Sequence, residues 1–330
     1  MPPLSARPRR HRNALWEMSL KRDVQPESII TDAAFRVAFS PDGKILAVAH
    51  TSKGEIILWD WEERCPIAAL HIPVAFWWYG GLLFSPDAKY LAAALPRPVR
   101  IWDVQSRREV ANLTNHTAFL TSLAFAARGG ILATSSADQT IKLWEVGTWR
   151  ELDTLKGHWN EVYALAASPD GNTLASGGKD GAVKLWSAKP TECQSSSVKL
   201  PNDIGLVALS ADGRHLLAVH TNGTFSVWAT AVLKTTGHGS IPLLAWSSAA
   251  IAAGGRQLAF GDTNGVVQMW DSRPIRDIRR PGGAAACANA LAFSPDATKL
   301  AASFEDRLVA VWDTAVSRPS FLRFAVGPWN

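Results

Sequence analysis

Residues 141–145 read Ile-Lys-Leu-Trp-Glu, and variants of this pentapeptide return at a fixed spacing along the 330-residue chain. Its tryptophan belongs to a series of seven, in which neighbours are 43, 42, 42, 42, 42 and 42 residues apart. The series comprises Trp59, Trp102, Trp144, Trp186, Trp228, Trp270 and Trp312. A constant period of this length indicates a protein built from repeated structural units.

A second landmark, a turn, precedes most of these tryptophans by about 19 residues. Ser-Pro-Asp or a close variant follows a short apolar run at residues 38–43, 83–88, 167–171, 209–213 and 292–297. Proline presets its backbone angle, aspartate bonds its own backbone, and glycine accepts positive φ. Short alternating segments such as residues 131–135 lie between the landmarks, and helical periodicity is absent. Each unit therefore holds about four short strands joined by tight turns.

Units of this length, with four strands and a Trp-Asp end, resemble the WD-repeat β-propeller family from about residue 24 onward. The resemblance implies an all-β fold, a single seven-bladed propeller with four antiparallel strands per blade. We expect a basic tail at 1–14 and the propeller at 15–330. Residues 15–30 are the favoured source of the strand that closes the last blade, and residues 319–326 are the alternative.

The resemblance also implies a hydrogen-bonded clamp of histidine, hydroxyl, aspartate and tryptophan inside a blade. An indole N–H only donates and a carboxylate only accepts, while hydroxyl and imidazole groups do both, so the four can form a chain. Blade 3 matches with His116, Thr134, Asp138 and Trp144. Blade 4 matches with His158, Ser176, Asp180 and Trp186. Blade 2 lacks the clamp, because Ala75, Ala93 and Pro96 stand at its positions.

Aromatic residues concentrate in the loops that join blades 2, 3 and 4. The candidate partner-binding residues are Phe76, Trp77, Trp78, Phe119, Trp159, Asn160 and Lys179. An exposed cluster of this composition is typical of a binding site, since tryptophan is enriched among residues that dominate binding energy. The alternative for Trp77 and Trp78 is a packing role, in which they fill blade 2 in place of its missing clamp.

The charge and cysteine content bear on partners and compartment. Net charge is +5, but Arg7, Arg9, Arg10 and Arg12 lie in the first 12 residues, and the rest holds 30 basic against 29 acidic residues. This disfavours nucleic acid as a partner except through the Arg-rich tail. The scattered cysteines Cys65, Cys193 and Cys287 show no metal-ligand spacing and fit a reducing compartment. We expect a cytoplasmic protein, with nuclear import through the tail as the alternative, and no metal or cofactor.

No sequence pattern of a catalytic site occurs: Walker loop, GxGxxG, HExxH and GxSxG are all absent. The uncharged stretch from Cys65 to Pro86 is interpreted as two strands and a turn, and no membrane contact is expected. The sequence therefore predicts a non-enzymatic scaffold or adaptor that binds proteins or peptides, as a monomer or in a hetero-complex. The alternative is a reader of a peptide tail through an aromatic-lined site in blades 2–4, with Glu161 or Glu305 as the acidic group. An enzymatic function is the least favoured hypothesis.

Overall fold

The computed structural model describes residues 34–322, with gaps at 43, 51–53, 61–62, 64, 73–79, 189–194, 211, 242–245, 253, 265, 271–275, 280–286, 294–297, 305–308 and 315–318. The described residues form 28 β-strands and one short 3-10 helix, η1 (Ala127–Gly129). The prediction of an all-β fold is confirmed. Within these ranges, no helix has the length and apolar character needed to cross a membrane.

The strands form seven antiparallel sheets of four, which we number 1 to 7 in chain order. Sheet 1 contains β1 (Ala34–Phe39), β2 (Ile45–His50), β3 (Glu55–Asp60) and β4 (Cys65–His71); sheet 2 contains β5 (Leu82–Phe84), β6 (Tyr90–Ala94), β7 (Val99–Asp103) and β8 (Arg108–Leu113). Sheet 3 contains β9 (Leu120–Ala126), β10 (Ile131–Ser136), β11 (Ile141–Glu145) and β12 (Glu151–Leu155); sheet 4 contains β13 (Val162–Ala167), β14 (Thr173–Gly178), β15 (Ala182–Ser187) and β16 (Ser195–Lys199).

The remaining sheets follow the same strand order. Sheet 5 contains β17 (Ile204–Leu209), β18 (His215–His220), β19 (Thr224–Ala229) and β20 (Lys234–Ser240). Sheet 6 contains β21 (Trp246–Ile251), β22 (Leu258–Asp262), β23 (Val266–Trp270) and β24 (Arg276–Arg279). Sheet 7 contains β25 (Ala288–Phe293), β26 (Lys299–Phe304), β27 (Val309–Asp313) and β28 (Pro319–Leu322).

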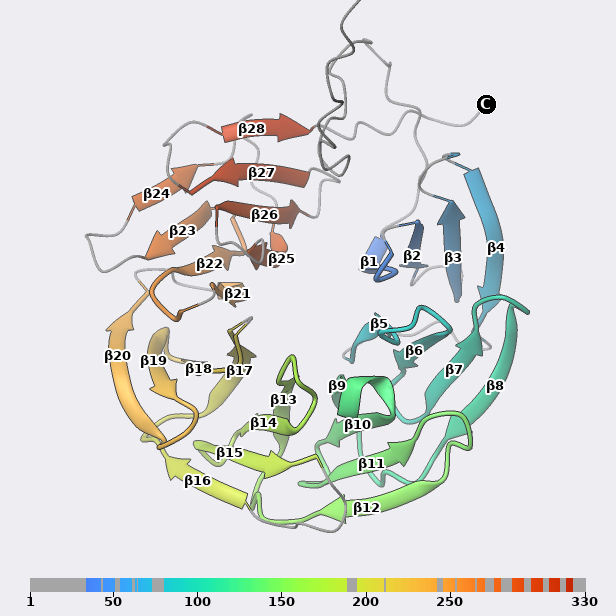
Figure 1. Ribbon diagram of the computed structural model, residues 1–330, viewed down its shortest axis with the longest axis horizontal. Helices are drawn as coiled ribbons and strands as arrows, with labels where there is room; N and C mark the ends of the chain where they lie inside the picture. The colour runs from blue at the N-terminus through green and yellow to red at the C-terminus, as the bar shows by residue number, and fades with distance from the viewer. Residues whose placement is uncertain are drawn as a thin grey trace, which may run out of the picture.

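The seven sheets follow one another in an arc around a common centre, with the first strand of each sheet nearest that centre (Figure 1). The inner strands of consecutive sheets contact one another from β1 and β5 through to β21 and β25. Each sheet therefore packs face to face on its neighbours in sequence, an arrangement that buries both faces of its middle strands.

The described residues form six hydrophobic clusters, one between each consecutive pair of sheets from sheet 1 to sheet 7. Alternation along β6 shows how the clusters are divided. Leu91 and Ala93 face sheet 1, whereas Tyr90, Ala92 and Ala94 face sheet 3. Every residue of β6 and of β10 is buried, and for β6 this agrees with a sequence of one tyrosine, one leucine and three alanines.

Four of the five Ser-Pro-Asp landmarks form turns between the first two strands of a sheet, as predicted, whereas residues 294–297 of the fifth lie outside the described residues. In sheet 2 the Ser85 hydroxyl donates to Asp87 Oδ1 at 2.5 Å, and the Lys89 N–H donates to the same oxygen at 3.1 Å. Ala88 occupies the glycine position of the motif with a φ of 60°. The same serine–aspartate bond recurs at residues 40 and 42, 168 and 170, and 210 and 212.

The outer strand of sheet 7 comes from the C-terminal part of the chain. β28 pairs with β27, so residues from the C-terminal alternative, 319–326, supply the outer strand of sheet 7. The favoured N-terminal segment 15–30 and the tail 1–14 lie outside the described residues. The uncharged stretch from Cys65 to Pro86 contains the short strands β4 and β5, in agreement with its interpretation as strands.

Candidate functional site

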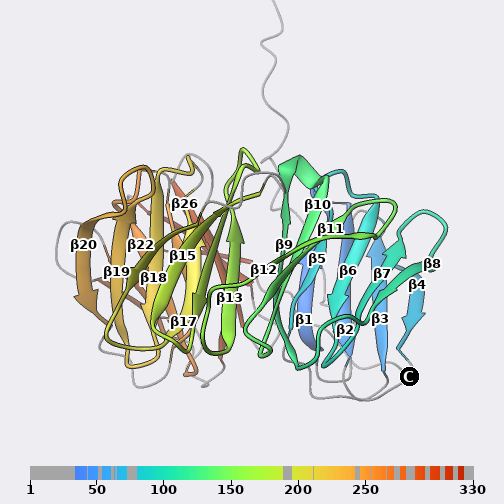
Figure 2. The same cartoon turned by 90° about the horizontal axis from the view of Figure 1, so that it is seen from below.

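The predicted partner-binding residues Phe119, Trp159, Asn160 and Lys179 belong to loops at one end of sheets 3 and 4. β9 begins at Leu120 and the antiparallel β10 ends at Ser136, so residues 115–119 and 137–140 lie at the same end. By the same geometry, residues 157–161 and 179–181 lie at this end of sheet 4. We call it the clamp face and the opposite end, which carries the Ser-Pro-Asp turns, the turn face; Figure 2 shows the strands running between the two.

The four residues predicted for the clamp of blade 3 lie in one hydrogen-bonded chain inside sheet 3. His116 Nδ1 is 2.7 Å from Asp138 Oδ2, and His116 Nε2 is 2.8 Å from Thr134 Oγ1. The Trp144 indole N–H donates to Thr134 Oγ1 at 3.0 Å. Because His116 and Thr134 are buried, this chain satisfies polar groups that have no access to water.

Sheet 4 brings its four predicted residues together in the same way. His158 Nδ1 is 2.8 Å from Asp180 Oδ2, and His158 Nε2 is 2.7 Å from Ser176 Oγ. The Trp186 indole N–H donates to Ser176 Oγ at 2.8 Å. A serine hydroxyl thus serves where sheet 3 uses a threonine.

Every hydrogen bond of the clamp can have one donor and one acceptor, in the order indole, hydroxyl, imidazole and carboxylate, only if both histidines are neutral. The indole donates to the hydroxyl, the hydroxyl donates to Nε2, and the Nδ1 proton is then left for the carboxylate. Burial lowers the pKa of His116 and of His158, and it outweighs the opposing effect of Asp138 and Asp180. At neutral pH the imidazoles are therefore in the state that the chain requires.

Each clamp aspartate also binds the backbone of an exposed loop. The Thr117 N–H donates to Asp138 Oδ2 at 3.0 Å, and the Trp159 N–H donates to Asp180 Oδ2 at 3.1 Å. These two loops carry Phe119 and Trp159, whose exposed fractions are 58% and 62%. Large apolar side chains are thus presented to solvent on backbone that the buried clamps fix in place.

Polar and charged groups surround Trp159. Lys199 Nζ lies 5.5 Å from the centre of its ring, within cation–π distance. Lys179 Nζ is 3.6 Å from Glu161 Oε1, and the Asn160 side-chain oxygen accepts the Glu161 N–H at 2.9 Å. We refer to Phe119, Trp159, Asn160, Lys179 and Lys199 as the clamp-face patch.

Glu161 has partners besides Lys179. Burial, together with a hydrogen bond to Glu161, raises the pKa of the Tyr163 phenol to about 12, so Tyr163 stays a protonated donor. The carboxylate of Glu161 therefore stands between a lysine and a phenol, and it is not a free acidic group beside the aromatic rings.

Phe76, Trp77 and Trp78 lie outside the described residues, and their role stays a prediction. The first residue after that gap, Gly80, packs tightly on β6. A Cβ at Gly80 would come 2.6 Å from the carbonyl oxygen of Ala94, so no larger residue fits without a shift of backbone.

Trp59 and Trp228 differ from Trp144 and Trp186 in having no clamp hydroxyl beside the indole. The indole nitrogens of Trp59 and Trp228 are buried without a hydrogen-bond partner. In sheet 4 the hydroxyl stands two residues after Leu174, which pairs with Trp186, and the corresponding residues are Val48 in sheet 1 and Ala218 in sheet 5. An apolar residue at this position explains each unpaired indole.

Lys199 is a member of the patch that the sequence does not predict. Lys199 pairs with Ala182, and this places it at the clamp-face end of sheet 4. Only the strand register shows this position; the spacing of the repeats does not. Among the residues that the structure describes, no group of three or more His, Cys, Asp or Glu side chains could hold a metal ion.

Comparison with known proteins shows which family these repeats match. The family model described as "IFT122 first beta-propeller" matches residues 79–318, and the model "WD domain, G-beta repeat" matches residues 26–60. A 111-residue segment is 32% identical to the rice (Oryza sativa subsp. japonica) protein "Small ribosomal subunit protein RACK1z", and equally to RACK1y from the same plant. A 106-residue segment is 34% identical to "Target of rapamycin complex subunit wat1" of Schizosaccharomyces pombe. Each match covers about a third of this chain and about a third of the relative.

Proposed function

The chain belongs to the WD-repeat β-propeller family, and we propose that it is a non-catalytic scaffold or adaptor that binds partner proteins or peptides on its clamp face. The observation that carries this proposal is the exposure of Phe119 and Trp159 on loops whose backbone N–H groups donate to the clamp aspartates. An exposed tryptophan on rigid backbone loses little conformational entropy when it binds, which favours affinity.

The proposal includes the finer architecture. The seven sheets are the seven blades of one propeller, in which sheet 7 closes on sheet 1, and residues 1–14 form a basic tail outside the ring. A closed ring leaves few strand edges open to unwanted pairing and gives the loops a stable base.

The printed names of the relatives agree with a role in assemblies. RACK1z is named as a protein of the small ribosomal subunit, and wat1 as a subunit of the target of rapamycin complex. We propose that this chain likewise works inside a protein complex, without a cofactor. Its exposed free thiol, Cys65, suits a reducing compartment, so we place it in the cytoplasm.

The contacts of Trp159 weigh against the second candidate, a reader that surrounds a cationic side chain with aromatic rings. Such a site needs an open ring face and a free carboxylate beside it. Lys199 already lies over the Trp159 ring, and Glu161 is engaged by Lys179. An incoming cation would have to displace Lys199 and compete with Lys179.

A paired-variant affinity purification tests the scaffold proposal. The double substitution Phe119→Ala and Trp159→Ala removes the two exposed side chains of the clamp-face patch, and mass spectrometry compares the recovered partners with those of the parent chain. The matched control, Val110→Ala with Val232→Ala, removes two exposed apolar side chains elsewhere. We expect partners to be lost only with the patch variant; unchanged recovery would contradict this site.

A further inference from the structure

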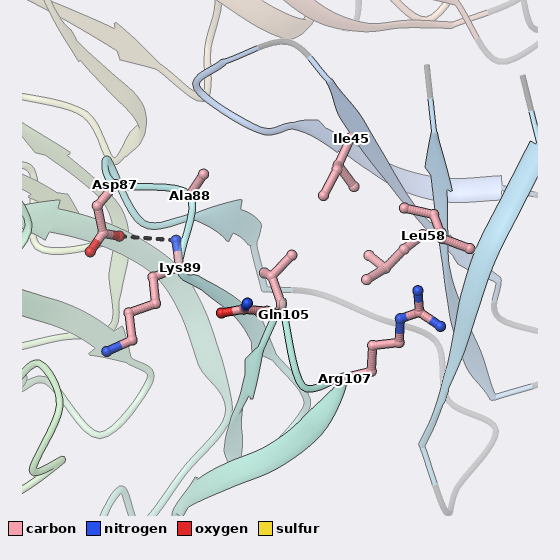
Figure 3. Close-up of a pocket in the computed structure, with 9 residues that line it drawn as sticks. Ile45, Leu58, Asp87, Ala88, Lys89, Gln105 and Arg107 are labelled. Atoms are coloured by element: carbon pink, nitrogen blue, oxygen red, sulfur yellow. Dashed lines mark hydrogen bonds between the residues drawn. The ribbon is translucent and has the colours of Figure 1, made fainter. Parts of the chain in front are cut away.

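A groove of about 440 Å³ lies between sheets 1 and 2 at the turn face, away from the clamp-face patch (Figure 3). Ile45, Leu58 and Ile67 of sheet 1 form one wall. The other wall comes from two turns of sheet 2, residues 87–89 and 104–107. The volume falls within the range of roughly 300–1,000 Å³ that is typical of ligand sites in proteins.

The neighbouring interface shows why this groove is open. Ile45 pairs with Asp60, the last residue of β3, and Tyr90 pairs with Asp103, the last residue of β7, so Ile45 and Tyr90 occupy equivalent positions. Their equivalence means that the wall formed by Ile45 between sheets 1 and 2 corresponds to the wall formed by Tyr90 between sheets 2 and 3.

Arg107 and Trp149 are equivalent by the same reasoning. The N–H of each donates at 2.8 Å to the carbonyl oxygen of the last residue of the preceding strand, and their φ angles are 60° and 58°. Between sheets 2 and 3, Tyr90 and Trp149 meet edge to face, with ring centres 5.0 Å apart. Between sheets 1 and 2 the two positions hold Ile45 and Arg107, and the space remains unfilled.

The rim of the groove carries one positive charge that faces it. Arg107 is exposed, extends toward Leu58 in Figure 3, and forms no ion pair with another residue of the described ranges. Lys89 and Asp87 point away from the apolar wall. Asp87 Oδ1 already accepts bonds from the Ser85 hydroxyl and the Lys89 N–H, and Lys89 Nζ lies 5.0 Å from the Tyr90 ring.

We propose that this groove is a second binding site, which takes a segment of a partner protein carrying one aromatic side chain beside a carboxylate. The aromatic ring occupies the space that Trp149 fills at the next interface, against Ile45 and Leu58. The carboxylate pairs with the Arg107 guanidinium, whose planar geometry suits two parallel hydrogen bonds to an acid. Because the turn face and the clamp face lie at opposite ends of the sheets, the chain can hold two partners at once.

The test measures binding of a dye-labelled synthetic peptide, with one tryptophan flanked by glutamates, to the full chain by fluorescence anisotropy. Arg107→Glu removes the ion pair, and Arg107→Trp fills the groove from within. Arg108→Glu, an equal charge change at an exposed neighbouring residue, is the control. We expect both Arg107 variants to weaken binding by about tenfold or more, which is the usual contribution of a hydrogen-bonded charge, and the control to bind normally.

Two altered peptides test the chemistry of the occupant. Alanine in place of tryptophan, or lysines in place of glutamates, should abolish binding, whereas Trp159→Ala in the chain should leave it intact. The proposal is overturned if neither the parent peptide nor its variants bind, if the lysine peptide binds equally, or if Arg107→Glu has no effect.

Stability and association measurements complete the test. Because its indole fills the groove, Arg107→Trp should have a melting temperature no lower than that of the parent chain. If the tryptophan variant fails to fold, the peptide affinity of Arg107→Glu tests the site instead. Sedimentation of the unliganded chain checks for a second copy as the occupant. A dimer that dissociates on the Arg107→Glu change would overturn the peptide proposal.

Discussion

The carboxylate of Asp180 connects the interior of sheet 4 to the exposed Trp159. Its Oδ2 atom accepts the Trp159 N–H at 3.1 Å and lies 2.8 Å from the Nδ1 atom of His158. The Asp180 side chain has no exposed surface, so packing and hydrogen bonds together fix its position. The order of a surface loop therefore depends on a buried polar chain, and changes to that chain should be measurable at the surface.

Asp180→Asn should lower the free energy of unfolding and loosen the loop of Trp159. The amide places a donor where Oδ2 now accepts, which leaves the Trp159 N–H unpaired at about 1–3 kcal/mol and leaves the His158 Nδ1–H only its longer contact with Oδ1, at 3.0 Å. Urea unfolding measures the stability, and hydrogen exchange at the Trp159 amide measures the loosening. Asp87→Asn is the control, because the Ser85 hydroxyl and the Lys89 N–H both donate to its Oδ1 atom and an asparagine oxygen accepts in the same way at Asn222.

Ser176→Ala should destabilise the chain more than Ser176→Thr. Alanine leaves the Trp186 indole N–H and the His158 Nε2 atom without partners inside a buried site, again at about 1–3 kcal/mol for each group. Threonine keeps the hydroxyl, as Thr134 does in sheet 3. Equal midpoints of unfolding for the two variants would contradict a stabilising role for the hydroxyl.

Ala218→Ser should stabilise sheet 5 by supplying the acceptor that Trp228 lacks. Ala218 stands two residues after the partner of Trp228, where the clamp hydroxyl stands in sheet 4, and the indole nitrogen is buried and unpaired. A new hydrogen bond contributes roughly 0.5–1.5 kcal/mol. The control, Ala175→Ser, buries a hydroxyl with no unpaired indole N–H beside it and should lower the free energy of unfolding. A lower free energy of unfolding for both variants would refute the prediction.

The extent to which the sequence predicts this structure depends on how local each feature is. The turns are predicted from the Ser-Pro-Asp motif, because neighbouring residues determine a turn. The number of strands is predicted from the regular spacing of the tryptophans, because each repeat forms one sheet. The clamp partners are predicted only through the family resemblance, because they are distant in sequence. Ser176 follows His158 by 18 residues, and Asp180 follows it by 22. Lys199 over Trp159 and the groove at Arg107 depend on strand register and on which sheets abut, so the period alone does not reveal them.

Stability should fall as the pH drops from 7 toward 5. Burial holds the pKa of His116, His158 and His220 below the ordinary value of 6.5, so the unfolded chain binds more protons than the folded one as the pH falls below 6.5. Stability rises with pH wherever the unfolded state binds more protons, and it is therefore lost on acidification.

Chemical denaturation at a series of pH values measures this dependence. A variant with His116→Gln and His158→Gln should show a shallower slope over the same range, although it is less stable overall. His71→Gln is the control for a histidine substitution outside the clamps, because the His71 side chain is 78% exposed. A parent chain whose stability is flat between pH 7 and 5 would rule out neutral buried histidines as a requirement of the fold.

Trp149→Ala should destabilise the chain by about 1–3 kcal/mol more than Arg107→Ala, although the two residues occupy equivalent positions in consecutive sheets. Trp149 is partly buried and packs against Tyr90 in the cluster between sheets 2 and 3; complete burial of a large apolar side chain contributes about 1.5–3 kcal/mol, partial burial less, and an edge-to-face pair adds about 0.5–1.5 kcal/mol. Arg107 lies beside an open groove, so its loss removes little packing. Both substitutions replace a residue with positive φ, so the backbone contribution is the same and cancels in the comparison. Urea unfolding midpoints measure the difference, and equal values would mean that the interface between sheets 2 and 3 is no better filled than the one between sheets 1 and 2.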